Sequence, residues 1–102
     1  MHILIQGLLQ METVLVVKNK DKLIIVNNSK EKIMIKKLII HYPSSVYLGS
    51  GTGHIKVKDE KEMQKELMPD EKFEITLLFP EAEKVSVFYL VRGISFSQDF
   101  EL

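Results

Sequence analysis

The last nine residues of the chain alternate apolar and polar side chains almost without exception. Residues 94–102 read Ile-Ser-Phe-Ser-Gln-Asp-Phe-Glu-Leu, and a period of two is typical of a β-strand with one buried face. Residues 73–79 and 85–91 alternate in the same way. These patterns predict half-buried strands and constrain the chain to a sheet-based fold.

Three further runs, rich in β-branched residues, lie in the first half, at Thr13–Lys18, Lys22–Asn27 and Lys32–His41. The last run changes phase at Lys36-Lys37, which predicts a bulge or a bend. Residues 59–67 are ambiguous, because a short helix competes there with an edge strand. Turn-forming residues separate the runs. They are Asn19-Lys20-Asp21, Asn27-Asn28-Ser29, Pro43-Ser44-Ser45, Pro69-Asp70-Glu71, Pro80-Glu81 and Arg92-Gly93.

Strands separated by turns at intervals of about ten residues are typical of an antiparallel sandwich or barrel. A chain of 102 residues, of which Val, Ile and Leu occupy 32, is expected to form one domain over residues 1–102 with a sizeable core. This composition excludes a disordered, a disulfide-stapled and a collagen-like chain. We expect six core residues to meet across the domain. They are Ile33, Ile35, Phe73, Ile75, Val85 and Val87.

Shifting the chain on itself by about half its length brings similar segments together. Residues 2–5 align with 54–57, residues 21–25 with 71–75, and residues 32–35 with 84–87. The predicted fold class is therefore mainly β, with antiparallel sheets built from two tandem motifs, 1–50 and 51–102, that pack as one domain. A single immunoglobulin-like sandwich is the alternative. The junction between the motifs would lie at Gly49–Gly53.

The two halves carry opposite net charge. Residues 1–50 hold seven lysines against three acidic residues, a net charge of +4, and residues 51–102 have a net charge of −4. Such a dipolar chain can associate head to tail in a way that added salt weakens. The alternative is that each half solvates its own surface.

No segment matches a catalytic or cofactor motif. The glycines of 49–53 lack the residues of a phosphate loop, and His2, His41 and His54 lack metal-ligand spacing. We therefore expect no enzyme activity, no cofactor and no metal site. The apolar stretch Met1–Val17 contains Gln6, Gln10 and Glu12, which argues against a membrane span or a signal peptide.

The resulting hypothesis is a non-enzymatic protein- or peptide-binding module. An extended peptide would pair with a strand edge or enter a groove between the two motifs. The candidate lining residues are Tyr42, Tyr47, Phe88 and Tyr89, for which ordinary core or sheet packing is the competing interpretation. One alternative is a structural, self-assembling virion or surface component, and the formation of a homo-oligomer would be compatible with that role. The third is weak nucleic-acid binding through Lys36-Lys37 and the tyrosines, against which stand a single arginine and a pI of about 6.8.

Two resemblances accompany this interpretation. The segments 26–33 and 67–73 are similar to strand–turn–strand segments of immunoglobulin-like sandwiches in archaeal surface proteins. The whole chain, with 13 lysines, one arginine, 11 isoleucines and no Cys or Trp, resembles small orphan proteins of filamentous viruses of thermoacidophilic archaea, of the Acidianus filamentous virus type. That resemblance implies a hyperthermophilic viral protein in the host cytoplasm or the virion, and it carries over no functional residues.

Overall fold

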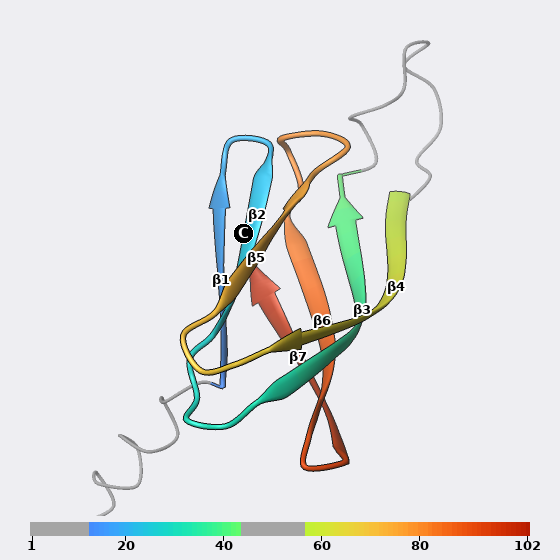
Figure 1. The fold of residues 1–102 in the computed structure, drawn as a ribbon. Helices are drawn as coiled ribbons and strands as arrows, with labels where there is room; N and C mark the ends of the chain where they lie inside the picture. Colours follow the sequence, from blue (N-terminus) through green and yellow to red (C-terminus); the bar gives the residue numbers. More distant parts are fainter. Residues whose placement is uncertain (1–12, 44–56) are drawn as a thin grey trace, which may run out of the picture.

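The computed structural model describes residues 13–43 and 57–102, and within these ranges the chain is built from β-strands (Figure 1). The strands are β1 (Val14–Asn19), β2 (Lys22–Asn27), β3 (Ile33–Tyr42), β4 (Val57–Leu67), β5 (Lys72–Thr76), β6 (Lys84–Val91) and β7 (Ile94–Glu101). The expected mainly β fold is confirmed. Residues 59–67, where a helix competed with a strand, belong to β4.

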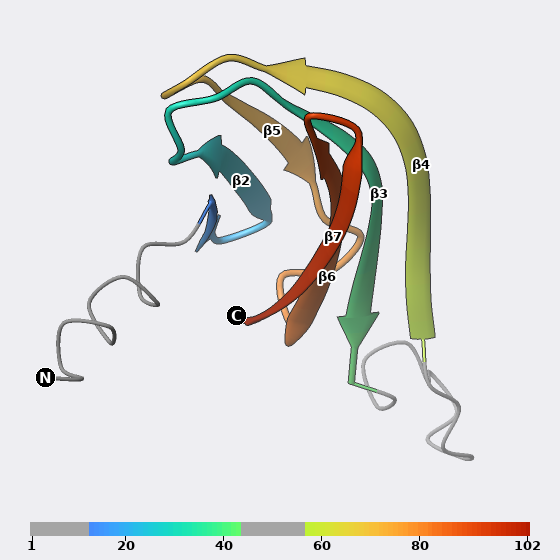
Figure 2. The ribbon, with the colours of Figure 1, turned by 90° about the horizontal axis from the view of Figure 1, so that it is seen from below.

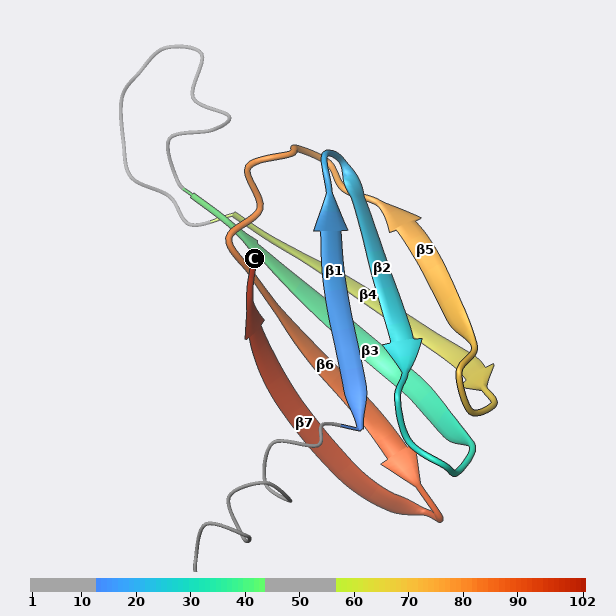
Figure 3. The same ribbon diagram turned by 90° about the vertical axis from the view of Figure 1, so that its left-hand side faces the viewer.

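The strands form a three-stranded sheet, in the order β1-β2-β5, and a four-stranded sheet, in the order β4-β3-β6-β7. All neighbouring strands are antiparallel, and the two sheets face each other as layers (Figures 2 and 3). The strand order agrees with the immunoglobulin-like alternative. It differs from the seven-stranded constant-type arrangement in one respect, because β4 pairs with β3 and not with β5.

The tandem repeat of residues 1–50 and 51–102 is not confirmed. The strands β2 and β5, which the repeat predicts to be equivalent, share one sheet, and β3 and β6 share the other. However, the first half places its hairpin β1–β2 in the three-stranded sheet, whereas the second half places its hairpin β6–β7 in the four-stranded sheet. The expected junction at residues 49–53 lies outside the described residues.

One core fills the space between the sheets. Four of the six expected core residues, Ile33, Ile35, Val85 and Val87, are at most 1% exposed. The other two, Phe73 and Ile75, are only half-buried against this core, which corrects the expectation. Both lie on β5, an edge strand of five residues that neighbours cover on one side only.

The predicted irregularity at Lys36-Lys37 is confirmed as a register shift between Ile35 and Lys37, seen against both neighbouring strands. The shift has a clear cause. The side chains of Ile33 and Ile35 point into the core before it, and those of Leu38, Ile40 and Tyr42 after it. A regular strand would turn one of these groups to solvent, so the bulge keeps both groups buried.

Candidate functional site

The two sheets expose four strand edges, and these differ in how far they are protected against pairing with another strand. Seven of the eleven residues of β4 are charged, a composition that blocks strand addition. The edges at β1 and β5 are short, with six and five residues. By contrast, β7 has eight residues and its only charges are Asp99 and Glu101, near its C-terminal end. The β7 edge is therefore the most accessible to a partner strand.

Two apolar side chains lie along the uncharged part of the β7 edge, residues 94–98. Ile94 is 60% exposed and Phe96 is 45% exposed. They pair in register with Val91 and Tyr89 of β6, so they lie on the sheet face that is directed to the core. The three-stranded sheet leaves them uncovered. The ring of Phe96 stacks on Tyr89, with centroids 5.6 Å apart, which holds it beside the edge.

The main chain of β7 offers hydrogen-bonding groups along the same edge. Leu102 N–H donates to the carbonyl oxygen of Glu83 at 2.9 Å, which fixes the phase of the ladder between β6 and β7. Hydrogen-bonded pairs alternate along an antiparallel ladder. The main-chain groups of Ser95, Ser97 and Asp99 therefore point away from β6, and no described strand lies beyond them.

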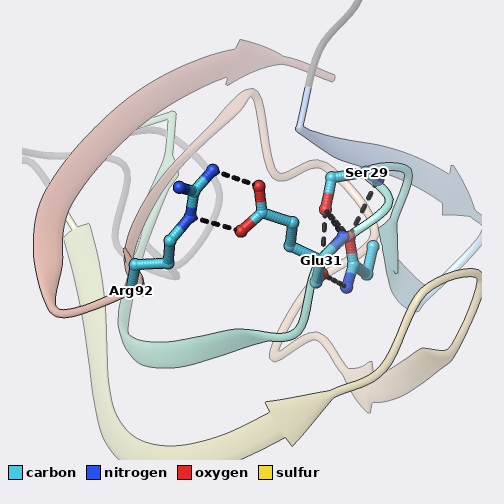
Figure 4. A network of polar contacts seen from close by, with 4 residues as sticks. Ser29, Glu31 and Arg92 are labelled. Atoms are coloured by element: carbon cyan, nitrogen blue, oxygen red, sulfur yellow. Dashed lines mark hydrogen bonds and ion pairs between the residues drawn. The ribbon is translucent and has the colours of Figure 1, made fainter.

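The turn that begins β7 is held in place by an ion pair. Arg92 and Gly93 have φ angles of 52° and 78°, as a two-residue type I′ hairpin turn requires. The Arg92 guanidinium binds the Glu31 carboxylate through two hydrogen bonds (Figure 4), of which Nε to Oε1 measures 2.6 Å. This hydrogen bond, together with the positive charge, lowers the pKa of Glu31 below its ordinary value.

Glu31 in turn belongs to a network around a buried amide. Asn27 is fully buried, and its Nδ2 donates to the carbonyl oxygens of Glu31, at 2.8 Å, and Leu67, at 2.9 Å. Its Oδ1 accepts from the N–H of Ser29 at 2.9 Å and lies 2.7 Å from the Ser29 hydroxyl (Figure 4). The connection from β2 to β3, the end of β4 and the start of β7 are thus tied together at one end of the sandwich.

The residues predicted from the sequence to bind a peptide do not form one surface. Tyr42 is buried, with its hydroxyl accepting from Leu78 N–H at 3.0 Å and its ring edge-on to Phe79. Burial raises the pKa of this phenol. Tyr89 packs in the core, whereas Phe88 lies on the opposite face of the sheet under the Lys37 ammonium, 5.3 Å from the ring centroid. Tyr47 lies outside the described residues.

Residues of both halves line two pockets among the described residues, one formed by Lys36 with residues 62–64 and one by Ile24 with residues 72–74. None of the predicted peptide-binding residues lines either pocket. The halves are interleaved, because β2 pairs with β5, and β3 pairs with both β4 and β6. The boundary between them is a set of main-chain ladders within continuous sheets. The strand-edge form of the hypothesis therefore fits this topology better than the groove form.

Sequence reasoning missed Ile94 and Phe96 as surface residues. Their alternation with serines was interpreted as a half-buried strand, and they do lie on the inward-directed face. Their exposure follows from the edge position of β7 and from the narrower opposite sheet. The only sequence signal was the low charge of residues 94–98 beside the high charge of 58–66.

Within residues 13–43 and 57–102, no three His, Cys, Asp or Glu side chains gather as metal ligands would. The same residues include no helix that is long and apolar enough to cross a membrane. Comparisons with protein-family models, curated proteins and solved structures find no match to this chain.

Proposed function

We propose that the protein is a non-enzymatic interaction module that captures an extended protein segment by main-chain pairing at the β7 edge. The observation that carries the proposal is the contrast between the two long edges. One is lined with charge on β4, and the other leaves Ile94 and Phe96 exposed on β7. Natural proteins protect long apolar edges against unintended pairing, so an unprotected edge marks a binding site.

The partner segment is defined by the two faces of β7. A strand added antiparallel to β7 places alternate side chains against Ile94 and Phe96, and these positions call for apolar residues. The intervening positions lie beside Ser95, Ser97 and Asp99 on the outer face, where polar or basic residues fit. An extended segment that alternates apolar with polar or basic residues meets both requirements.

The test uses a fluorescently labelled synthetic peptide in which valine alternates with lysine, and a scrambled peptide of the same composition. We expect the alternating peptide to bind with measurable anisotropy change and to shift amide resonances of residues 94–99. Phe96→Lys places a charge beside the edge and abolishes binding. Leu78→Lys is the matched control, because Leu78 is also exposed, at 60%, but lies outside β7.

Binding of both peptides alike, or resonance shifts centred on β4, would contradict strand addition at β7. Because Phe96→Lys also removes the stacking on Tyr89, thermal unfolding of each variant is measured alongside. A second variant, Ser97→Pro, replaces an outward-directed N–H and leaves Phe96 in place. It is expected to weaken binding in the same way.

A further inference from the structure

The outer face of the three-stranded sheet carries a contiguous aliphatic block. Leu15 is directly opposite Val26, and Val17 is directly opposite Ile24. Leu15 and Val17 are 39% and 51% exposed, and the two β2 residues are half-buried. Figure 3 shows this sheet in front of the four-stranded one, with its outer face towards the viewer.

This block departs from the pattern of a solvent-facing sheet. An antiparallel sheet with one wet face alternates apolar and polar residues, whereas strands covered on both faces read as continuous apolar runs. Residues 14–17 read Val-Leu-Val-Val and residues 23–26 read Leu-Ile-Ile-Val. The core covers only one face of β1 and β2. The continuous apolar sequence of both strands therefore indicates that their outer face is also covered in the functional state of the protein.

The third strand of the sheet, β5, adds one charged residue to each of the two rows of paired aliphatic residues in this block. Lys72 continues the row of Leu15 and Val26, and Glu74 continues the row of Val17 and Ile24. Both charged side chains are exposed. The two rows are therefore alike in shape, each with two aliphatic side chains and one charged one, and opposite in charge.

Two such faces are complementary to each other about a two-fold axis. The axis lies between the two faces, parallel to the sheets, perpendicular to the strands and midway between the two rows. Rotation about this axis places the row of Leu15 and Val26 in one copy against the row of Val17 and Ile24 in the other. The aliphatic pairs then meet, and each Lys72 faces the Glu74 of the other copy. Sheets packed face to face in this way fit the aligned packing found in sandwiches, and the contact closes with two-fold symmetry.

We propose that the outer face of the three-stranded sheet is a homodimer interface, centred on Leu15, Val17, Ile24 and Val26 and aligned by Lys72 and Glu74. It is separate from the β7 edge, which belongs to the other sheet. The partner that the charge pattern selects is a second copy of this chain.

The test is sedimentation equilibrium of the full chain, combined with charge exchange. Val17→Lys is expected to leave only monomer at concentrations where the wild type is dimeric. Lys72→Glu and Glu74→Lys each turn two attractive pairs into repulsive ones, and each should raise the dimer dissociation constant about tenfold. The double variant exchanges both charges, restores complementarity and should return the constant to the wild-type value.

Mixing the two single variants gives a sharper result. A chain with Lys72→Glu presents two acidic charges and one with Glu74→Lys presents two basic charges, so the mixture should form a heterodimer in preference to either homodimer. Lys58→Glu, an exposed charge reversal on β4, is the control and should leave the dimer unchanged. Circular dichroism verifies that every variant is folded.

A wild-type chain that stays monomeric at all accessible concentrations would overturn the proposal. A dimer that is insensitive to both single charge reversals, or that the double variant fails to restore, would also overturn this interface.

Discussion

Asn27 is the only fully buried polar side chain among the described residues, and its amide donates to main-chain carbonyl oxygens of the β2–β3 connection and of the end of β4. We predict that Asn27→Ala lowers the free energy of unfolding by about 2–4 kcal/mol, because the carbonyl oxygens of Glu31 and Leu67 lose their donors within a partly dry site. Urea unfolding measures the loss. Lys30→Ala, an exposed change in the same connection, is the control, and a loss for Asn27→Ala as small as for Lys30→Ala would refute the prediction.

We expect Tyr42 to make the free energy of unfolding depend on pH in the alkaline range. Because burial raises its pKa, the folded protein keeps the phenol proton to a higher pH than the unfolded chain does. The stabilisation is complete below the unfolded pKa of about 10 and is lost as the pH rises through the folded pKa. We expect the wild type to lose stability above pH 10 more steeply than Tyr42→Phe. Parallel slopes in urea unfolding across this range would exclude the effect.

At the scale of single elements, the turn between β6 and β7 depends on Gly93. A Cβ atom added there would meet nothing within 4 Å, so any cost of substitution arises from its φ of +78°. We predict a loss of about 1–2 kcal/mol for Gly93→Ala. Gly93→Asn should cost less, because asparagine tolerates the left-handed region. Equal stability of the alanine variant and the wild type in thermal unfolding would contradict this reasoning.

Most of the strands could be predicted from the local sequence. The β2 segment was predicted with its observed ends, and the bulge was visible as the phase change at Lys36-Lys37. The predicted strand at residues 73–79 was too long, because β5 ends at Thr76. After it, Leu77 N–H donates to the Asp21 carbonyl oxygen and Leu78 N–H to the Tyr42 hydroxyl. Those partners are distant in sequence, so periodicity could not reveal them.

The candidate site could not be predicted from the local sequence in the same way. Whether a strand is central or at an edge depends on pairing between segments far apart in the chain, and a single sequence does not specify it. Phe88 and Tyr89 were grouped as neighbours, yet successive residues of a strand face opposite sides. The repeat was inferred from similar strand patterns, which many β-rich segments share, and such similarity does not determine the sheet that each strand joins.

At the scale of the whole molecule, the edge strand β5 is less well covered than its central neighbour β2. Leu23 on β2 is fully buried, whereas Ile75, directly opposite it on β5, is half-buried. We predict that Leu23→Ala costs about 2–5 kcal/mol and that Ile75→Ala costs about 1–2 kcal/mol, in proportion to its smaller buried area. Chemical denaturation compares the two. A loss for Ile75→Ala equal to that for Leu23→Ala would show that β5 is as well covered as β2.

The interleaving of the two halves also determines how the chain can reach this structure. The hairpins β1–β2 and β6–β7 close through two-residue turns, but Ile25 must find Phe73, and Leu38 must find Val87, across roughly half the chain. Joining such distant segments costs loop-closure entropy before any contact repays it, so β-sandwiches of this kind fold in about milliseconds to seconds. During synthesis, β2 and β3 emerge long before their partners β5 and β6. β2 can pair with β1, and β3 with β4, before those partners emerge, but one edge of β2 and one edge of β3 must stay unpaired until β5 and β6 have been made.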